Sequence, residues 1–358
     1  MILLIKYWRD NVNKKVLYGI LFGIFFFHLA FFILSTTYAH SKQNIPVPPL
    51  LGNSPENIAS IHEENINPHP FTMFLIADTH SKVMFEHFFT KTNFDSSPDF
   101  GIMLGDFVDD PEDQRHEFFI MEISEWGLEY PLFLAPGNHD IAVKEKYLKK
   151  KNAFTMDEFE DTYGATNFSF IYSGCLFIVI NNHWNTEYID FLNGVLSSKP
   201  EGILMTFVFM HIPPQTLSPL MECRGMENVE GFMNLMETYA VDYVFSGDYH
   251  SYFRSTIGST EYIILGGGGA ALDGDEGRSF HHAMLLNINP EKETVHEMIY
   301  PINSVIDFLD LVEQFAFFHV YNLFVYYPAL YVLILTTNLA LLFAFIVCMA
   351  RQKKKGDK

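Results

Sequence analysis

Five groups of side chains that could bind metal ions or transfer protons lie in the middle of the chain. They are Asp78 with His80, Asp106, Asn138 with His139 and Asp140, His211, and Asp248 with His250. Carboxylate and amide oxygens mixed with imidazole nitrogens suit Mn, Fe, Zn or Mg and differ from the donors of a thiolate site. Any one group alone is more typical of a turn or a helix cap. The five together, each following a short apolar run, predict a metal centre.

Each group directly follows a short, uninterrupted apolar run, at 71–77, 100–104, 130–136, 203–210 and 241–246. Runs of this kind are typical of strands that are covered on both faces, and the stretch 116–127 is typical of a covering helix. The carboxyl ends of such strands meet at one edge of a sheet, so the five groups are expected to converge there. Further strands are predicted at 176–181, 262–266 and 282–288. Little helix separates the strands of 261–300, which favours antiparallel pairing.

The motifs ADTH, GDFVDD, GNHD, MHIPP and GDYH, in this order, resemble those of the calcineurin-like metallophosphoesterase superfamily. This superfamily includes the purple acid phosphatases and bacterial phosphodiesterases. The resemblance extends from Phe71 to about Ile288. It implies an α/β fold, a four-layer α/β/β/α sandwich of mixed sheets, and hydrolysis of a phosphate monoester or diester.

The resemblance also implies roles for individual residues. One divalent ion would be held by Asp78, His80, Asp106 and His250. Asp106 would bridge to a second ion, whose other ligands would be Asn138, His211 and Asp248. A hydroxide between the two ions would attack phosphorus, His139 would protonate the leaving oxygen, and Asp140 would orient the His139 ring.

Asp248 departs from the family pattern, which has histidine at this position. A carboxylate oxygen lies as many bonds from Cα as imidazole Nδ1, so Asp248 is expected to remain a ligand. The alternative is a weakened or missing second metal.

Two further residues are candidates for substrate contacts. Arg254 closely follows the last motif, which favours contact with a substrate phosphate, and a surface ion pair is the alternative. His183 follows the strand predicted at 176–181 and is expected to line the pocket.

Both ends of the chain are apolar, and each predicts one transmembrane helix, at 16–38 and 319–350. A cleaved signal peptide is the alternative for the first segment, and a buried core helix is the alternative for the second. Basic residues lie in the terminal segments 1–15 and 351–358. The positive-inside rule therefore places both termini in the cytoplasm and the middle of the chain outside it.

Between the predicted spans, the sequence suggests a proline-rich, extended linker over 39–70, a catalytic domain over 71–300 and an amphipathic juxtamembrane helix over 301–318. Without the basic ends, 14 basic and 41 acidic residues remain, a formal charge of −27. Such a surface repels polyanions, so no nucleic-acid partner is expected.

The sequence thus predicts a membrane-anchored phosphoesterase that acts outside the cytoplasm. The expected substrate is a phosphoester, and lipid-linked phosphoesters are among the candidates. The lipid bilayer is itself an expected partner. A catalytically weak metal-binding domain that senses or binds a partner is the alternative, but the pair His139 and Asp140 favours the enzyme.

Overall fold

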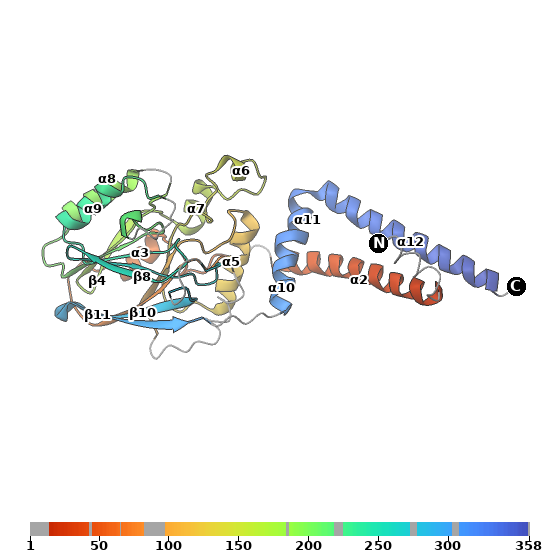
Figure 1. Cartoon of the computed structure of the whole chain (residues 1–358), viewed down its shortest axis with the longest axis horizontal. Helices are drawn as coiled ribbons and strands as arrows, with labels where there is room; N and C mark the ends of the chain where they lie inside the picture. The colour runs from red at the N-terminus through yellow and green to blue at the C-terminus, as the bar shows by residue number, and fades with distance from the viewer. Residues whose placement is uncertain are drawn as a thin grey trace. The chain divides into compact units, whose positions relative to one another are not determined.

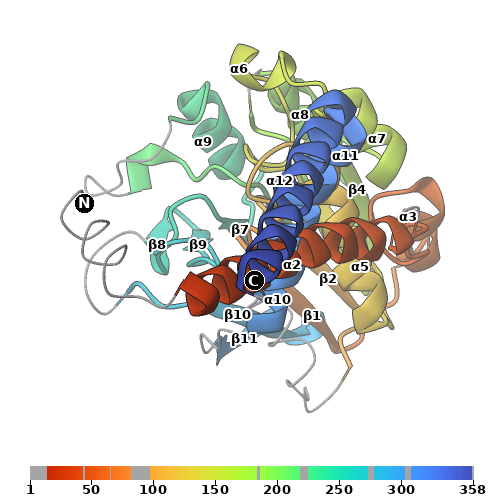
Figure 2. The same cartoon turned by 90° about the vertical axis from the view of Figure 1, so that its right-hand side faces the viewer.

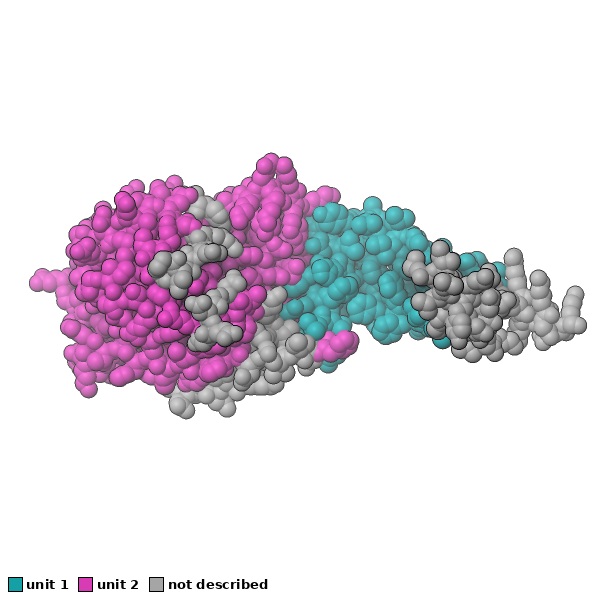
Figure 3. All heavy atoms as spheres, viewed as in Figure 1, with its two compact units in different colours: residues 1–43, 309–358 teal, residues 44–308 magenta. Residues whose placement is uncertain are grey.

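The computed structural model describes residues 14–42, 45–64, 66–81, 97–183, 186–217, 225–272, 278–302 and 308–356. The chain divides into two compact units, residues 44–308 and residues 1–43 with 309–358 (Figure 3). Of the predicted cytoplasmic segment 1–15, residues 1–13 lie outside the described residues. The last two residues of the predicted basic tail 351–358 also lie outside them.

The unit formed by residues 44–308 contains two mixed sheets. Its strands are β1 (Phe71–Ile76), β2 (Phe100–Leu104), β3 (Leu132–Ala135), β4 (Phe168–Tyr172), β5 (Cys175–Val179), β6 (Met205–Phe209), β7 (Tyr243–Ser246), β8 (Phe253–Ile257), β9 (Thr260–Ile264), β10 (His282–Asn289) and β11 (Thr294–Pro301). One sheet has the order β11-β10-β1-β2-β3, and the other has the order β4-β5-β6-β7-β9-β8. Strands β1, β2 and β3 are parallel, as are β5, β6, β7 and β9.

Helices cover the outer faces of both sheets (Figure 1). Helices α5 (Asp113–Trp126) and α7 (Met156–Tyr163) pack on the first sheet, and α8 (Glu187–Ser197) and α9 (Val229–Thr238) pack on the second. Helix α3 (Pro55–Ile61) instead packs against the core between the sheets. The unit also contains the short helix α6 (Glu145–Leu148) and the 3-10 turns η1 (Gln215–Leu217) and η2 (Pro290–Lys292).

Alternation along the strands produces three apolar layers. In β1, Met73 and Leu75 pack between the sheets with Phe207 of β6, while Phe74 packs outward against α5 and α7. The outer face of the second sheet packs against α8 and α9. The predicted four-layer α/β/β/α sandwich is therefore confirmed.

All eight strands expected from apolar runs are present, but β4, β8 and β11 were not predicted. The expectation of antiparallel late strands is correct for β10, which pairs with β1 and β11. It is wrong for β9 on one side, because β9 runs parallel to β7 and antiparallel to β8.

The segment before β1 differs from the extended linker expected over 39–70. Ser54 caps α3 through its side chain, and Pro55 opens the helix, where its missing N–H costs nothing. Asn53 is fully buried: its amide nitrogen donates to Leu134 O (2.7 Å) and its side-chain oxygen accepts from Leu134 N (2.9 Å). Asn53 thus satisfies the open edge of β3, so this segment packs onto the domain.

The second unit is helical. It contains α2 (Lys14–Ser41), the π-helix η3 (Ala316–Tyr321), α11 (Asn322–Tyr326), α12 (Pro328–Gly356) and all but the first residue of α10 (Phe308–Phe315). Helices α2 and α12 lie side by side (Figures 1 and 2), where the Phe32 and Tyr331 rings stack at 4.7 Å and the Thr36 and Tyr331 hydroxyls lie 2.9 Å apart.

Two helical segments are long and apolar enough to cross a bilayer, Phe22–Ser41 and Pro328–Val347. The second begins later than the expected 319–350, because the helix is interrupted at Tyr327 (φ −130°) and restarts at Pro328. The amphipathic helix expected over 301–318 also differs: β11 extends to Pro301, α10 begins at Phe308, and residues 303–307 lie outside the described residues.

Candidate metal centre

The seven residues predicted as metal ligands lie directly after five strands. Asp78 and His80 follow β1, Asp106 follows β2, Asn138 follows β3, His211 follows β6, and Asp248 and His250 follow β7. Since β1–β2–β3 and β6–β7 are parallel sets, these residues emerge at the carboxyl ends of their strands.

The backbone at the site is in the left-handed region at five of these ligands. The φ angles are 52° at Asp78, 51° at His80, 52° at Asp106, 61° at Asp248 and 53° at His250. Positive φ is uncommon for residues other than Gly, although Asp and His adopt it more readily than most, and such conformations are concentrated at functional sites. Hydrogen bonds from Asp78 N to Gly105 O (3.0 Å) and from His80 N to Asp106 O (2.9 Å) hold the first two loops together.

Two motif glycines are required by close approach. A Cβ on Gly137 would lie 2.2 Å from the backbone nitrogen and from Oδ1 of Asp106, and a Cβ on Gly105 would lie 2.4 Å from Nδ1 of His211. Gly105 also has a φ of 84°. A side chain at either position would push apart the loops that carry Asp106 and His211.

The side chains form two groups whose potential ligand atoms lie within 4.8 Å of one another. One group is Asp78, His80, Asp106 and His250, and the other is Asp106, His211 and Asp248. Asp106 belongs to both: its Oδ2 lies 3.5 Å from His80 Nε2 and 3.3 Å from His211 Nε2. The structure thus brings six of the seven predicted ligands into two groups, with Asp106 common to both.

Several buried donor atoms face this cluster without a satisfying partner. Apart from neighbouring carboxylates, His80 Nε2, His211 Nε2 and Asn138 Oδ1 have no hydrogen-bond partner among the described residues. In two histidines of the cluster the Nδ1 atom is already used, since His211 Nδ1 donates to Leu104 O (2.7 Å) and His250 Nδ1 donates to Ala271 O (2.7 Å). Metal-binding histidines are held in this way, with the free Nε2 aimed at the ion. The donor set therefore fits divalent metals.

The electrostatics also fit a cation. Burial alone would raise the pKa of Asp106, but the nearby His211, His80 and His139 together hold that pKa well below its ordinary value. Burial alone would lower the pKa of His250, but its contact with Asp78 raises that pKa to about 9. Protonated imidazoles thus balance the carboxylates in the metal-free chain. Divalent ions at these positions would displace those protons.

His139 lies beside the ligands, with its ring centroid 4.7 Å from that of His80 and its Nε2 4.0 Å from Asp106 Oδ2. Its backbone N–H donates to Asp106 Oδ1 (2.7 Å), and its Nδ1 donates to Asp109 O (2.5 Å). Because Nδ1 is occupied by a carbonyl, the proton that His139 can exchange with solvent or substrate is on Nε2.

Asp140 makes contacts other than the predicted one with the His139 ring. Its Oδ2 accepts from the backbone nitrogens of Asp106 (2.8 Å) and Gly137 (2.7 Å), and its Oδ1 accepts from Val108 N (3.1 Å). Burial and the Asp106 carboxylate raise the pKa of Asp140 to about 8. Asp140 thus ties the Asp106 loop to the His139 loop, and the partner at His139 Nδ1 is Asp109 O.

The structure separates the two predicted substrate contacts. His183 is buried, and its ring centroid lies 5.2 Å from that of His211, which places it beside the ligand cluster. Arg254 instead donates to Glu261 of β9 (2.8 Å) and to Glu297 of β11 in the other sheet (2.8 Å). Its position on half-exposed β8 directs it into these ion pairs, so the alternative reading of Arg254 as a surface ion pair is the correct one.

His116 of α5 was not singled out in the sequence. It is buried, stacks on Phe154 at 3.6 Å, and its Nε2 donates to Asp140 O (2.9 Å) while Tyr163 OH donates to its Nδ1 (3.1 Å). Burial lowers the pKa of His116 to about 3. No local pattern distinguishes His116 from any other histidine on a covering helix, because its partners lie 24 and 47 residues away.

His116 should make the folded protein sensitive to acid. Its pKa is lower in the folded than in the unfolded chain, so the unfolded chain binds more protons and stability is lost as the pH falls below 6.5. Relative to His116→Gln, wild type should lose about 1.4 kcal/mol of unfolding free energy per pH unit between pH 6.5 and 3. Urea unfolding of both full-length proteins at pH 7.5, 6.0 and 5.0, each with chelator, measures the difference. Parallel pH dependence of the two midpoints would contradict the assignment.

The fold and the site together define a class of metal-binding hydrolases. A family model described as calcineurin-like phosphoesterase matches residues 71–252, half of the chain. The chain therefore belongs to the calcineurin-like phosphoesterase family, whose members are hydrolases acting on phosphoester bonds.

The chain is similar to the serine/threonine-protein phosphatase CPPED1 of Rattus norvegicus, with 23% identity over 190 residues, 45% of this chain and 54% of that protein. It thus spans about half the length of this relative. Among solved structures, it is similar to GAP50, described as the anchor in the inner membrane complex of Plasmodium (13% identity, 70% of this chain and 96% of that one, TM-score 0.44). It is also similar to a dimetal phosphatase from Danio rerio (12% identity, 65% and 99%, TM-score 0.42).

Proposed function

We propose that the protein is a membrane-anchored, metal-dependent hydrolase of phosphate monoesters or diesters that acts outside the cytoplasm. The observation that carries this proposal is the pair of ligand groups that share Asp106, with His139 beside them. Structural ion pairs do not need two imidazole-containing groups with unsatisfied Nε2 atoms, whereas a site for two divalent ions does.

Asp78, His80, Asp106 and His250 would hold one divalent ion, and Asp106, Asn138, His211 and Asp248 would hold the second. Such ions, whether Mn, Fe, Zn or Mg, would supply the positive charge that binds a phosphate and makes water a stronger nucleophile. The domain surface is acidic, so attraction of phosphate has to come from this centre. For the same reason we expect no nucleic-acid substrate.

His139 would act as the general acid. Asp109 O holds its Nδ1, so the protonated ring presents Nε2–H toward the ligand cluster, where the leaving oxygen needs a proton. His183, buried beside His211, would line the substrate pocket. Asp140 and His116 are proposed to have no direct contact with substrate. They hold the backbone that carries Asp106 and His139.

The activity is tested by assaying the full-length protein in detergent against phosphomonoesters, phosphodiesters and lipid phosphates, with Mn, Zn, Mg and Fe in turn. Hydrolysis of at least one class that disappears with chelator supports the proposal. Absence of metal-dependent turnover across the whole panel, with correctly folded protein, would overturn it.

The proposed anchors are α2 and α12, and the basic residues flanking them support a topology with both termini in the cytoplasm. An active site held near a bilayer would favour a phosphoester that is itself linked to lipid.

In a background without native cysteines, Glu201→Cys should react with an impermeant maleimide added to intact cells, because the catalytic domain is expected outside. Lys355→Cys should react only after the membrane is permeabilised. The opposite pattern would place the enzyme in the cytoplasm. A mature chain that starts near His40 would instead identify the first span as a signal peptide.

A further inference from the structure

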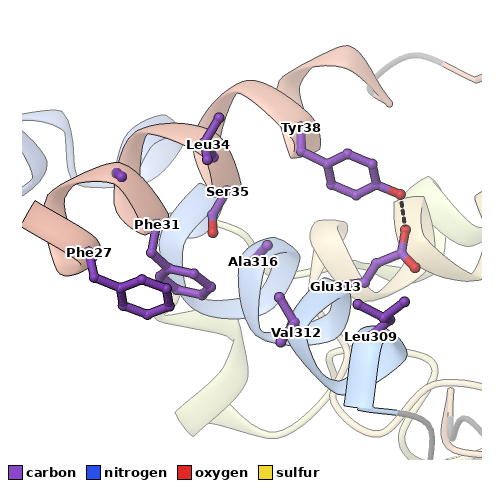
Figure 4. A pocket seen from close by; sticks show the side chains of 10 residues that line it. Phe27, Phe31, Leu34, Ser35, Tyr38, Leu309, Val312, Glu313 and Ala316 are labelled. Carbon is purple, nitrogen blue, oxygen red and sulfur yellow. Dashed lines mark hydrogen bonds between the residues drawn. The ribbon is translucent and has the colours of Figure 1, made fainter.

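The helical unit contains a cavity of about 510 Å³ between α2 on one side and α10 with the start of η3 on the other (Figure 4). We call this cavity the helix groove. It is lined by Phe27, Ala30, Phe31, Leu34, Ser35, Tyr38, Leu309, Val312, Glu313 and Ala316. Its volume lies in the range of small-molecule sites, roughly 300–1,000 Å³. Nothing in the phosphoesterase mechanism uses these residues.

The helix groove is apolar along most of its length and polar at one end. Figure 4 shows Phe27 and Phe31 at one end and the Tyr38 hydroxyl donating to the Glu313 carboxylate at the other. Lys42, one helical turn beyond Tyr38, places its ammonium 5.9 Å from the centre of the Tyr38 ring. The polar end thus carries the Glu313 carboxylate and the Tyr38 hydroxyl, with the Lys42 ammonium beside it and outside the lining of the groove.

The walls of the groove continue onto an exposed apolar surface. Phe27 is 72% exposed, Leu34 67% and Leu309 73%. Contact between so many large apolar side chains and water is unfavourable. The side chains from α2 belong to a segment that is apolar enough to cross a bilayer. With the membrane anchoring proposed above, the groove would open toward lipid rather than toward water.

We propose that the helix groove binds one zwitterionic phospholipid, with an acyl chain along Phe27, Ala30 and Phe31 and the head group at Tyr38, Lys42 and Glu313. This inference rests on the membrane anchoring proposed above and is independent of the phosphoesterase chemistry. The lipid phosphate matches the Lys42 ammonium, and the lipid ammonium matches the Glu313 carboxylate. An anionic lipid without an amine would satisfy Lys42 but place a second negative charge beside Glu313.

The position of the groove gives the bound lipid a structural role. Its two walls come from segments more than 270 residues apart in the sequence, the end of α2 and α10. A lipid that contacts both walls would hold the juxtamembrane helix against the first span, in the way that any ligand stabilises the state that binds it.

The test uses the full-length protein, purified in detergent and mixed with equal amounts of phosphatidylethanolamine, phosphatidylglycerol and diacylglycerol, and native mass spectrometry counts the lipids retained. Wild type should keep one phosphatidylethanolamine per chain. Ala30→Trp, which fills the groove, should weaken retention at least tenfold. Ala340→Trp adds the same bulk at an exposed position of α12 outside the groove, and it should behave like wild type.

Glu313→Gln keeps the shape of the side chain, so it tests the proposal even if Ala30→Trp does not fold. It should reduce the preference for phosphatidylethanolamine over phosphatidylglycerol by about tenfold. Equal retention of all three lipids by wild type, or unchanged retention and selectivity in both groove variants, would overturn the proposal. So would a chain dimer that is lost in Ala30→Trp while lipid binding is unchanged.

Phosphoesterase activity of each preparation is measured in parallel. Groove variants should retain wild-type hydrolysis of a soluble substrate, since none of the residues changed is a proposed ligand or acid. If wild type selects the lipid but hydrolyses no substrate, the result would support the lipid site and contradict the proposed phosphoesterase activity. Recovery of wild type in the soluble fraction without detergent would remove the membrane anchoring on which the groove depends.

Discussion

Asp106→Asn should lower turnover by about 10³-fold or more, equivalent to about 4 kcal/mol of transition-state stabilisation. Asp106 is the residue that belongs to both ligand groups, so losing its charge should weaken the binding of both proposed ions at once. The asparagine side-chain oxygen can still accept the His139 N–H that Asp106 Oδ1 accepts at 2.7 Å. The loop that carries His139 should therefore stay in place, and the loss should come from the metal centre.

The matched control is Asp157→Asn, which makes the same change on the exposed face of α7. It should leave turnover within a factor of two of wild type. Initial rates and metal content are measured for all three proteins. A wild-type rate for Asp106→Asn with a cognate phosphoester would mean that this carboxylate has no part in catalysis.

Asp248→Ala should lose about one bound metal ion per chain and lower turnover by roughly 10²-fold, while the ion held by Asp78, His80, Asp106 and His250 stays bound. Asp248 Oδ1 lies 3.6 Å from His211 Nε2, which places the carboxylate at the second group. The Asp248 backbone N–H also donates to Asp78 (3.2 Å), whatever the side chain is.

Asp248→His separates ligation from a structural role, because imidazole is the ligand that the family pattern has at this position. It should restore the second ion and much of the activity. Removing one negative charge from the second site should also make the bound water more acidic, so the activity of Asp248→His should rise at lower pH than that of wild type. Wild type should prefer Mn or Mg over Zn there. Unchanged metal content and unchanged pH profiles across the three proteins would make Asp248 a bystander.

Strands that are covered on both faces were predictable from sequence, and half-covered strands were not. In β6 every side chain is buried, and its run of apolar residues was recognised. In β8 and β11 the side chains are largely half-buried or exposed, and charged residues such as Arg254 and Glu297 pair across the surface. Their sequences resemble loops because pairing with neighbours, rather than burial, fixes their conformation.

The positions of the candidate ligands were predictable for a related reason. Each follows a recognisable buried strand, and parallel topology then brings distant strand ends together without further information. The contacts of Asp140 could not be predicted from the sequence. A carboxylate that accepts backbone N–H groups from Asp106, Gly137 and Val108 depends on how two loops approach each other, and only the folded chain specifies that approach.

The segment around Asn53 illustrates the same limit. Prolines and polar residues predicted an extended linker, and most of those residues are indeed exposed or half-buried. The buried Asn53 amide pairs with both backbone groups of Leu134, and backbone hydrogen bonds between Leu50, Gly52 and Leu132 also attach the segment to the edge of β3. Composition describes a segment's average tendency, whereas specific long-range contacts decide its position.

Metal content and activity measured together on one sample test the central claim most directly. Full-length protein is stripped with chelator, a divalent metal is added back stepwise, and bound ions per chain are counted by mass spectrometry at each step while hydrolysis is assayed. We expect no turnover in the stripped protein and full turnover when two ions are bound per chain. Undiminished turnover in protein shown to contain no metal would contradict the account.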